Sequence, residues 1–368
     1  MILFAALAVA SAAYHALALF TGLRKSVVRQ TLSPAISILK PVRGRDDRFL
    51  EAIRSHARQD YPEYEILFGT SDPNDPARAD IESLIAEFPK LSIRLISVET
   101  DAPNTKVGVL EKLAEQARFP VLLINDSDIL VEPDYLTQAV APLADEHVGL
   151  VTCLYRGSGG SLAARAEALG IATEFAPSVL VARQIGFHEF AMGSTLALRA
   201  SDVARIGGFR VIRDFLADDY QLGKQITALG LTVVLGNPVV ETSLGSGSWS
   251  DVWKHQLRWS RTIRISRAAG YFGYIITVTL LWSVAAALAG FVWLAAATYL
   301  MRWLSGLVVA GLVLKDRESV ERWWWVPARD LFGLAVWVAG TWGREVEWRG
   351  KKMSIDREGR ITYAAKNL

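Results

Sequence analysis

Two aspartates, separated by one residue, follow an apolar run about a third of the way along the sequence. Val121-Leu122-Leu123-Ile124 is typical of a buried strand, and Asn125-Asp126-Ser127-Asp128 follows it. A continuous apolar run without alternation favours a central parallel strand covered on both faces. Ligands of such sheets bind beyond the carboxyl ends of the strands, where two carboxylates can share a divalent cation that holds a diphosphate. The alternative is a solvated turn, with Pro133 opening the next helix.

Further residues have the types that chemistry on a diphosphate needs. Asp72 can accept hydrogen bonds from a nucleobase or ribose, and Lys106, beside Asn104, can add a point charge to the phosphates. Asp219 can take a proton from an acceptor hydroxyl as general base. Arg258 can stabilise a leaving diphosphate as charge develops, and Trp259 offers a stacking face. The set predicts a nucleotide-sugar transferase with an acceptor on the lipid side. The alternative for Asp219 and its neighbour Asp218 is capping, because the start of a helix favours acidic residues.

The segment that must position most of these residues, 34–247, has the sequence pattern of an α/β domain. Strands are expected at 35–41, 64–69, 92–98, 121–124 and 148–155, and helices at 49–59, 77–88 and 106–117. Strands that alternate with helices of this length predict βαβ units and a mostly parallel sheet. Right-handed crossovers place the strand ends on one edge, so Asp72, Asp126 and Asp128 are expected to share it.

Apolar runs on both sides of this domain predict membrane segments. Residues 1–23 are long enough for one transmembrane helix, and a cleaved signal peptide is the alternative. Residues 248–271 predict an amphipathic interfacial helix that carries Arg258 and Trp259. Residues 272–314, interrupted by the single charge of Arg302, predict two transmembrane helices. Residues 323–342 predict a third transmembrane or interfacial segment, and 343–368 form a basic tail.

The charges that flank these runs set an expected orientation. Arg24, Lys25 and Arg29 follow the first run, which places the α/β domain in the cytoplasm by the positive-inside rule. If every later run spans, however, the basic tail falls on the outer side, against the same rule. Two alternatives follow: one segment near the end is interfacial or re-entrant, or the rule does not hold for this chain.

Composition excludes several classes of protein. The 368 residues are 51% hydrophobic and carry a net charge of only +2, with the basic residues beside membrane runs, which argues against nucleic-acid binding. A single cysteine, Cys153, rules out an intramolecular disulfide framework and a cysteine-built zinc site.

The order of these motifs resembles that of the GT-A glycosyltransferases (families 2 and 21), and among them the ceramide glucosyltransferase family. The resemblance covers about Ser37 to Arg267, together with Val346-Glu347-Trp348-Arg349-Gly350. The three aspartates of the family pattern fall on Asp72, Asp126 and Asp219. Its Asn-x-Lys and (Q/R)-x-x-R-W motifs fall on 104–106 and 255–259, except that His255 takes the first position of the latter, with Gln256 adjacent.

The resemblance implies a Rossmann-like GT-A domain at the cytoplasmic face of the inner membrane. It implies inverting transfer of a sugar, first of all glucose, from a UDP-sugar to the hydroxyl of a membrane lipid such as ceramide. Asp219 is then the base, Asp218 supports it, and Asp128 with Asp126 holds Mg²⁺ or Mn²⁺. The alternatives are a hopanoid-lipid N-acetylglucosaminyltransferase of the same fold, a processive polysaccharide synthase, and a non-catalytic membrane scaffold.

Overall fold

The structure is a computed structural model that describes residues 1–24, 33–348 and 351–362. The chain divides into two compact units, which we call the sheet unit (26–155 and 188–245) and the helical unit (1–25, 156–187 and 246–368). Each is described by itself. Lys25 and Arg29 of the predicted cytoplasmic flank, and Arg349 and Gly350 of the predicted tail motif, lie outside the described residues.

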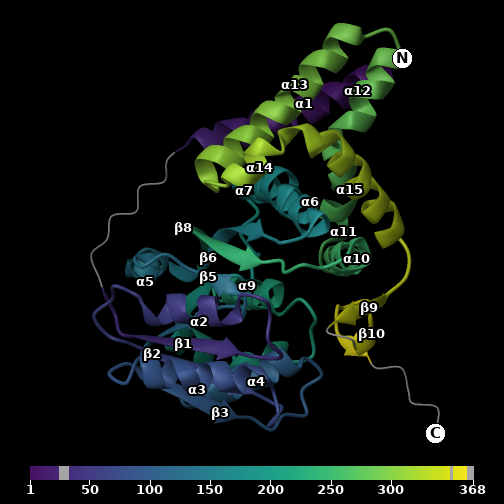
Figure 1. Ribbon diagram of the computed structural model, residues 1–368. Helices are drawn as coiled ribbons and strands as arrows, with labels where there is room; N and C mark the ends of the chain where they lie inside the picture. The colour runs from purple at the N-terminus through teal and green to yellow at the C-terminus, as the bar shows by residue number, and fades with distance from the viewer. Residues whose placement is uncertain (25–32, 349–350, 363–368) are drawn as a thin grey trace, which may run out of the picture. The chain divides into compact units, whose positions relative to one another are not determined.

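The sheet unit is built on a mixed, mostly parallel sheet (Figure 1). Within the described residues the strand order is β3-β2-β1-β4-β7-β6-β8-β5. The strands are β1 Ile36–Pro41, β2 Tyr64–Thr70, β3 Ser92–Ser97, β4 Val121–Ile124, β5 Ile129–Leu130, β6 Val148–Ser158, β7 Leu196–Arg199 and β8 Thr232–Ser243. The pairs β1/β2, β1/β4 and β2/β3 are parallel, whereas β7 runs antiparallel to both β4 and β6. The predicted βαβ alternation therefore accounts for the first half of the sheet.

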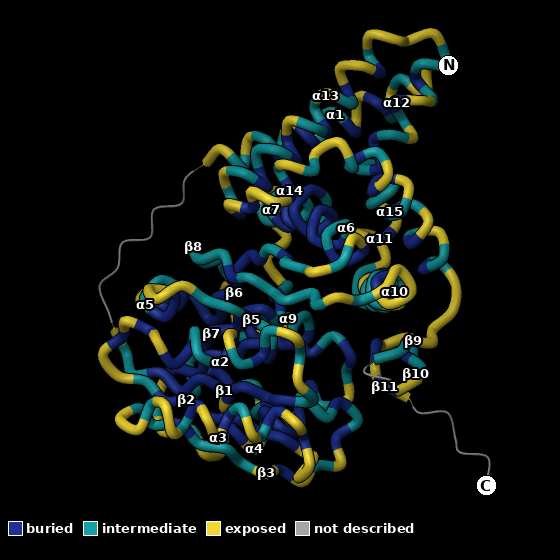
Figure 2. Tube along the Cα trace, viewed as in Figure 1, coloured by how far each residue is buried: buried dark blue, intermediate teal, exposed yellow. Residues whose placement is uncertain are grey.

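Helices join and cover these strands. They are α2 Phe49–Ala57, α3 Ala77–Glu87, α4 Thr105–Glu115, α5 Tyr135–Val140, α8 Ala200–Arg205 and α9 Asp218–Ala228, with 3-10 turns at Ala141–Ala144 and Phe209–Ile212. Strands β1 and β4 are buried along their whole length, as Figure 2 shows for β1. The unbroken apolar run of β4 predicts this burial, whereas β1 also buries two polar residues, Ser37 and Lys40.

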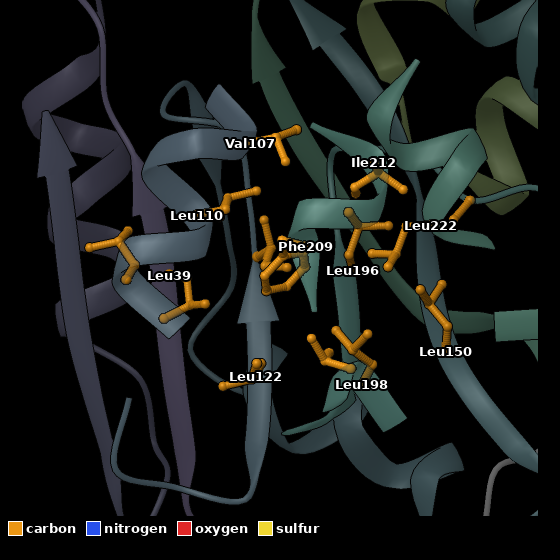
Figure 3. Packing of buried hydrophobic residues seen from close by; sticks show 14 of the residues in the cluster. Leu39, Val107, Leu110, Leu122, Leu150, Leu196, Leu198, Phe209, Ile212 and Leu222 are labelled. Atoms are coloured by element: carbon orange, nitrogen blue, oxygen red, sulfur yellow. The ribbon is translucent and has the colours of Figure 1, made fainter. Parts of the chain in front are cut away.

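The core of the sheet unit also holds the two helices that carry predicted site residues. Leu39 and Leu122 of neighbouring strands pack in one cluster with Val107 of α4 and Leu222 of α9 (Figure 3). Val107 directly follows Lys106, and Leu222 lies three residues after Asp219. Because these apolar side chains are anchored in the core, the starts of α4 and α9 are held in place.

The helical unit contains the remaining elements. They are α1 Ile2–Leu23, α6 Leu162–Gly170, the π-helical turn Ile171–Phe175, α7 Ala176–Gln184, α10 Trp249–Ser266, α11 Ala268–Gly273, the 3-10 turn Tyr274–Thr277, α12 Thr279–Leu288, α13 Val292–Val308, the π-helical turn Val309–Val313, α14 Arg317–Glu321, the 3-10 turn Trp323–Trp325, α15 Val326–Gly340, β9 Glu345–Trp348, β10 Lys351–Ile355 and β11 Ile361–Thr362. The sheet β11-β10-β9 closes the described chain.

Two helices of the described chain, Ile2–Leu23 and Val292–Val313, are long and apolar enough to cross a membrane. The pair Ala268–Thr277 and Thr279–Leu288, bent by 49°, adds a third candidate if it is one broken span. The predicted third C-terminal segment folds as α15, whose 15 residues are fewer than the roughly 20 that a perpendicular span needs.

Polar side chains tie the apolar helices to one another. His15 of α1 hydrogen bonds to Ser305 of α13 (2.8 Å) and to Thr279 of α12 (2.7 Å), and Ser11 also reaches Thr279 (2.9 Å). Hydrogen bonds between helices are one of the forces that hold helices together in lipid. These contacts join α1 to α12 and α13 although they lie more than 260 residues apart in the sequence.

Arg302, the one charge within its apolar run, faces protein. Its guanidinium, 1% exposed, donates to Asp330 (2.8 Å) and to the Thr173 carbonyl (2.9 Å). Arg329 pairs with Glu174 at 3.0 Å, and Glu174 lies 4.0 Å from Arg302. We call Arg302, Arg329, Glu174 and Asp330 the Arg302 cluster. Its two cations and two carboxylates balance.

The arginines of the amphipathic helix α10 also have partners inside the unit. Arg261 donates to the Trp342 carbonyl (3.1 Å) and Arg264 to that of Gly343. These carbonyls follow the end of α15, where cations are favoured by the helix dipole. Both arginines therefore stabilise the connection from α15 to β9.

Candidate active site

The turn after β4 presents Asp126 and Asp128. Asn125 is buried, and its amide donates to the Ser194 carbonyl (2.8 Å) and to the Tyr135 hydroxyl (2.8 Å). Thr242, which pairs with Ile129 in the β5/β8 register, donates to Asp128 Oδ2 at 2.5 Å. The backbone on both sides of the turn is thus held, and the carboxylates project from a fixed support.

Lys106 pairs with one carboxylate from the turn after β4 and one from the start of α9. Lys106 Nζ lies 2.8 Å from Asp126 Oδ1 and 3.2 Å from Asp218 Oδ2, while the Gly193 amide donates to Asp219 Oδ2 at 2.9 Å. We call Lys106, Asp126, Asp218, Asp219 and Gly193 the Gly193 cluster.

The glycine is the centre of this cluster. A Cβ added there would meet Asp126 Oδ2 at 3.1 Å, Lys106 Nζ at 3.5 Å and Asp219 Oδ2 at 3.6 Å. The close approach of the backbone to three charged groups therefore leaves little room for a side chain at this position.

Asn104 brings the two helix starts together. Its Oδ1 accepts from the Val107 amide (3.4 Å), which caps α4 immediately before Lys106. Its Nδ2 donates to the Phe215 carbonyl (2.8 Å), in the segment that leads to α9. One side chain thus couples the position of Lys106 to that of Asp218 and Asp219.

Burial and neighbouring charges shift the acidity of the cluster. Burial, and then the charge of Asp218, raise the pKa of Asp219 from 3.8 to about 6, against the opposing effect of Lys106. Burial, and then Asp126, raise the pKa of Asp128 to about 6 as well. For Lys106, burial favours the neutral form, but Asp126 and Asp218 outweigh it and raise the pKa above its usual range. Asp219 is therefore a stronger base than an ordinary aspartate and is still mostly ionised at neutral pH.

A second lysine lies beneath the turn. The side chain of Lys40, at the end of β1, is fully buried and donates to the Asp126 carbonyl (3.2 Å). It also lies 3.3 Å from Nε2 of the buried His56. Burial lowers the pKa of Lys40 to about 7, although Asp128 and Asp126 attract its charge.

The donor set of the turn can be compared with what a cation needs. Among the described residues, no group of three or more His, Cys, Asp or Glu side chains is arranged to hold a metal ion. Asp126 and Asp128 therefore cannot enclose an ion alone. Two carboxylates do suit Mg²⁺ or a similar hard cation that takes its other ligands from a diphosphate and water. The residues present fit a shared site of that kind.

The other predicted site residues belong to other elements of the chain. Asp72 is exposed at the end of β2, where it accepts from the Asn74 amide (2.9 Å). Arg258 and Trp259 belong to α10 of the helical unit, where Arg258 lies over the Trp348 ring at 5.9 Å. The structure brings Lys106, Asp126, Asp218 and Asp219 together. That Asp72, Arg258 and Trp259 serve the same reaction stays a prediction.

Sequence reasoning missed Gly193 and Lys40. Glycine carries no chemical group, so nothing in the loop Met192-Gly193-Ser194 marked its amide as a donor to Asp219. Lys40 did leave a signal, because a lysine in a buried strand requires partners.

Comparison with known proteins extends this description. Residues 2–361 match the model of glycosyl transferase family 21. Ceramide glucosyltransferase 1 of Caenorhabditis elegans is 27% identical over 214 residues, which cover 57% of this chain and 46% of that protein. Ceramide glucosyltransferase 3 of the same organism is 26% identical over 241 residues, covering 64% and 52%. The chain spans about half the length of the curated relatives it matches.

Among solved structures, the fold is similar to that of a mannosyltransferase from Pyrobaculum calidifontis in complex with GDP-Man and Mn²⁺. The TM-score is 0.55, with 18% identity over 92% of this chain and 99% of that one. At this identity the likeness concerns the fold, which is the α/β GT-A fold predicted from the sequence. The predicted resemblance is confirmed by the family match, which extends over almost the whole sequence: the chain belongs to glycosyl transferase family 21.

Proposed function

We propose that this protein transfers a sugar from a UDP-sugar to the hydroxyl of a membrane lipid, with glucose and ceramide as the first candidates and with inversion at the anomeric carbon. The Gly193 cluster supports the proposal, because it contains an aspartate of raised pKa, Asp219, together with Lys106 and Asp126 of the two-aspartate turn. The names of the ceramide glucosyltransferase relatives support the choice of donor sugar and acceptor.

Asp219 is the proposed general base. The lipid hydroxyl attacks the anomeric carbon, the bond from that carbon to the diphosphate oxygen breaks, UDP leaves, and Asp219 accepts the hydroxyl proton. Amides of Gly193 (2.9 Å) and Tyr220 (2.7 Å) hold its two oxygens. The carboxylate is thus oriented before the acceptor arrives.

The donor diphosphate is assigned to Lys106 and the Asp126-Ser127-Asp128 turn. Lys106 offers a positive charge, and Asp126 and Asp128 would hold Mg²⁺ or Mn²⁺. When bound, such a cation would neutralise charge on the diphosphate. Asp72 is assigned to the nucleobase or ribose.

Arg258 and Trp259 are assigned to the departure of UDP. A guanidinium that meets charge as it develops on the leaving diphosphate lowers the barrier. Trp259 is assigned to stacking in the same site, for which its ring supplies an aromatic face.

The membrane arrangement follows from the apolar helices. We assign spans to α1, to the bent pair 268–288 and to 292–313, with α15 lying outside the set. Two of these three spans follow Arg24, so the chain crosses the membrane and returns. The basic tail then lies on the same side as Arg24, which removes the conflict with the positive-inside rule. In this arrangement the sheet unit faces the cytoplasm at the inner membrane.

A transfer assay on the purified full chain in lipid nanodiscs tests the proposal. Labelled UDP-glucose, UDP-N-acetylglucosamine and GDP-mannose are each offered with ceramide or a hopanoid lipid. Glucose on ceramide is expected. N-acetylglucosamine on the hopanoid lipid would identify the sister reaction, long polymer would identify a synthase, and no transfer at all would contradict the proposal.

The base is tested in the same assay by Asp219→Asn. General-base catalysis is worth about 10²- to 10⁴-fold, so turnover should fall by that factor. Asp214→Asn, at an exposed aspartate before α9, is the matched control and should keep wild-type turnover. Full turnover by Asp219→Asn would exclude it as the base.

A further inference from the structure

The arginine–tryptophan motif begins with a histidine where the family pattern has glutamine or arginine. His255 Nδ1 donates to Glu167 Oε1 at 2.7 Å, and Gln256 Nε2 donates to the same oxygen at 2.8 Å. Glu167 lies on α6 and is 4% exposed. Two successive residues of α10 are thus held by one buried carboxylate oxygen from another helix.

The same contacts reach the tryptophan of the motif. His255 and Trp259 are one helical turn apart, and their ring centroids lie 4.5 Å from each other. On another side the Trp259 ring lies 6.0 Å from Phe175, which ends the π-helical turn after α6. The segment 162–175 therefore supplies the carboxylate that orients His255 and a ring that packs on Trp259.

Gln256 also connects α10 to Arg329 of α15. Its Oε1 accepts from Arg329 at 3.0 Å, and Arg329 also donates to Glu174 at 3.2 Å. Burial raises the pKa of Glu167, but its hydrogen bond from His255 and the nearby charges outweigh this and hold it below the usual value. Glu167 is therefore ionised at neutral pH and can act only as an acceptor.

We infer that Glu167 is a positioning residue for Arg258 and Trp259, and that the first position of the motif must supply a hydrogen-bond donor to it. Glutamine, arginine and histidine all have such a donor, which explains why His255 can stand at this position. The inference rests on the proposed role of Arg258 and Trp259 in the transfer.

Substitutions at the two ends of this contact test the inference in the nanodisc assay. Glu167→Met and His255→Phe remove the hydrogen bond and keep the approximate size of each side chain. Because a misplacement of about 1 Å can cost about 10²-fold in rate, each should lower kcat by roughly ten- to a hundredfold. KM for the sugar donor should stay the same, since Arg258 is assigned to charge that appears only in the transition state.

Two further sets of variants distinguish a positioning role of Glu167 from a role in stability alone: variants that keep the hydrogen-bond donor, and the double variant. His255→Gln and His255→Arg keep a donor and should retain most of the wild-type kcat. The double variant Glu167→Met/His255→Phe should be no slower than either single variant, because both remove one interaction. Tyr271→Phe loses a hydrogen bond to the Trp337 carbonyl in the same unit and is the control: it should lower the melting temperature without lowering kcat.

Three results would overturn the inference. They are a kcat of His255→Phe equal to that of His255→Gln, additive losses of kcat in the double variant, and a Glu167→Met variant that lowers only the melting temperature. A wild-type chain that transfers no sugar in any combination would contradict the proposed function first, and this inference with it.

Discussion

The Gly193 cluster and the Arg302 cluster use the same kinds of side chain with opposite charge balance. In the Arg302 cluster, two guanidinium groups meet two carboxylates, and Arg302 is almost completely buried. The Gly193 cluster has one ammonium group and three carboxylates: Lys106 pairs with Asp126 and Asp218, and Asp219 accepts from the Gly193 amide. The Asp126 side chain is 43% exposed.

We interpret this difference as that between a structural site and the proposed ligand site. A balanced, buried cluster satisfies its own charges, so removing one partner leaves an uncompensated charge and costs stability. An unbalanced, partly open cluster has carboxylates in excess, and a cation with its diphosphate would complete it. Mutations in the Gly193 cluster and its turn should therefore lower turnover, whereas mutations in the Arg302 cluster should lower stability.

The largest expected effect is on turnover at the two-aspartate turn. A bound cation is worth several kcal/mol, and each 1.36 kcal/mol is tenfold, so Asp128→Asn should lower transfer by about 10²- to 10³-fold. The melting temperature should not fall, because the change relieves repulsion from Asp126. Initial rates at increasing Mn²⁺ or Mg²⁺, with a chelator-treated wild type for comparison, measure this. Wild-type rates in the variant would remove Asp128 from the site.

The next effect is on stability in the Arg302 cluster. Arg302→Met leaves Asp330 buried without its partner and should lower the free energy of unfolding by about 3–5 kcal/mol. Adding Asp330→Leu should restore much of the loss. Arg317→Met breaks an exposed pair with Glu321 and should cost less than about 1 kcal/mol. Denaturant unfolding in detergent compares them, and equal losses for Arg302→Met and Arg317→Met would show that burial of the pair is not decisive.

A smaller effect on turnover is expected from Gly193→Ala. The added Cβ would lie 3.1 Å from Asp126 Oδ2, so the carboxylate or the loop must move. Overpacking costs about 1–3 kcal/mol, which corresponds to about a tenfold or greater loss of kcat if it falls on the reacting geometry. Gly273→Ala, where a Cβ meets nothing within 4 Å, is the control. Unchanged kcat in Gly193→Ala would show that the cluster tolerates the side chain.

The smallest effect is a shift in pH dependence. The proposed base, Asp219, can accept a proton only when it is deprotonated, so kcat/KM should fall as the pH drops through about 6. The charge of Asp218 raises this pKa, and its removal by Asp218→Asn should move the acidic limb to lower pH. Rate profiles from pH 5 to 8 measure the limb. A limb that stays in place, or moves to higher pH, would assign it to a different group.

The sequence predicted the parts of the fold that depend on local pattern. The unbroken apolar run at Val121 matched β4, and the alternation of strands and helices matched the parallel half of the sheet. The antiparallel pairing of β7, which inserts between β4 and β6, was not predicted. Its place depends on long-range pairing with β4 and β6, which periodicity along the chain does not record.

The site was predictable where function requires a charged side chain. Asp126, Asp219 and Lys106 were selected by residue type, and the structure places them around one glycine. The main-chain amide of Gly193, the buried support of Lys40 and the carboxylate of Glu167 depend on contacts between distant segments. Glu167 in particular reads in the sequence as an ordinary helical glutamate, although it is buried against His255, 88 residues away.

Calorimetric titration of Mn²⁺ into the full chain, with and without UDP, tests most directly whether the Gly193 cluster and its turn bind a cation together with a diphosphate. If the diphosphate completes the coordination, UDP should tighten Mn²⁺ binding at least about tenfold, Mn²⁺ should tighten UDP binding by the same factor, and Asp128→Asn should abolish the coupling. Equal Mn²⁺ affinity with and without UDP, or coupling that survives Asp128→Asn, would contradict the account.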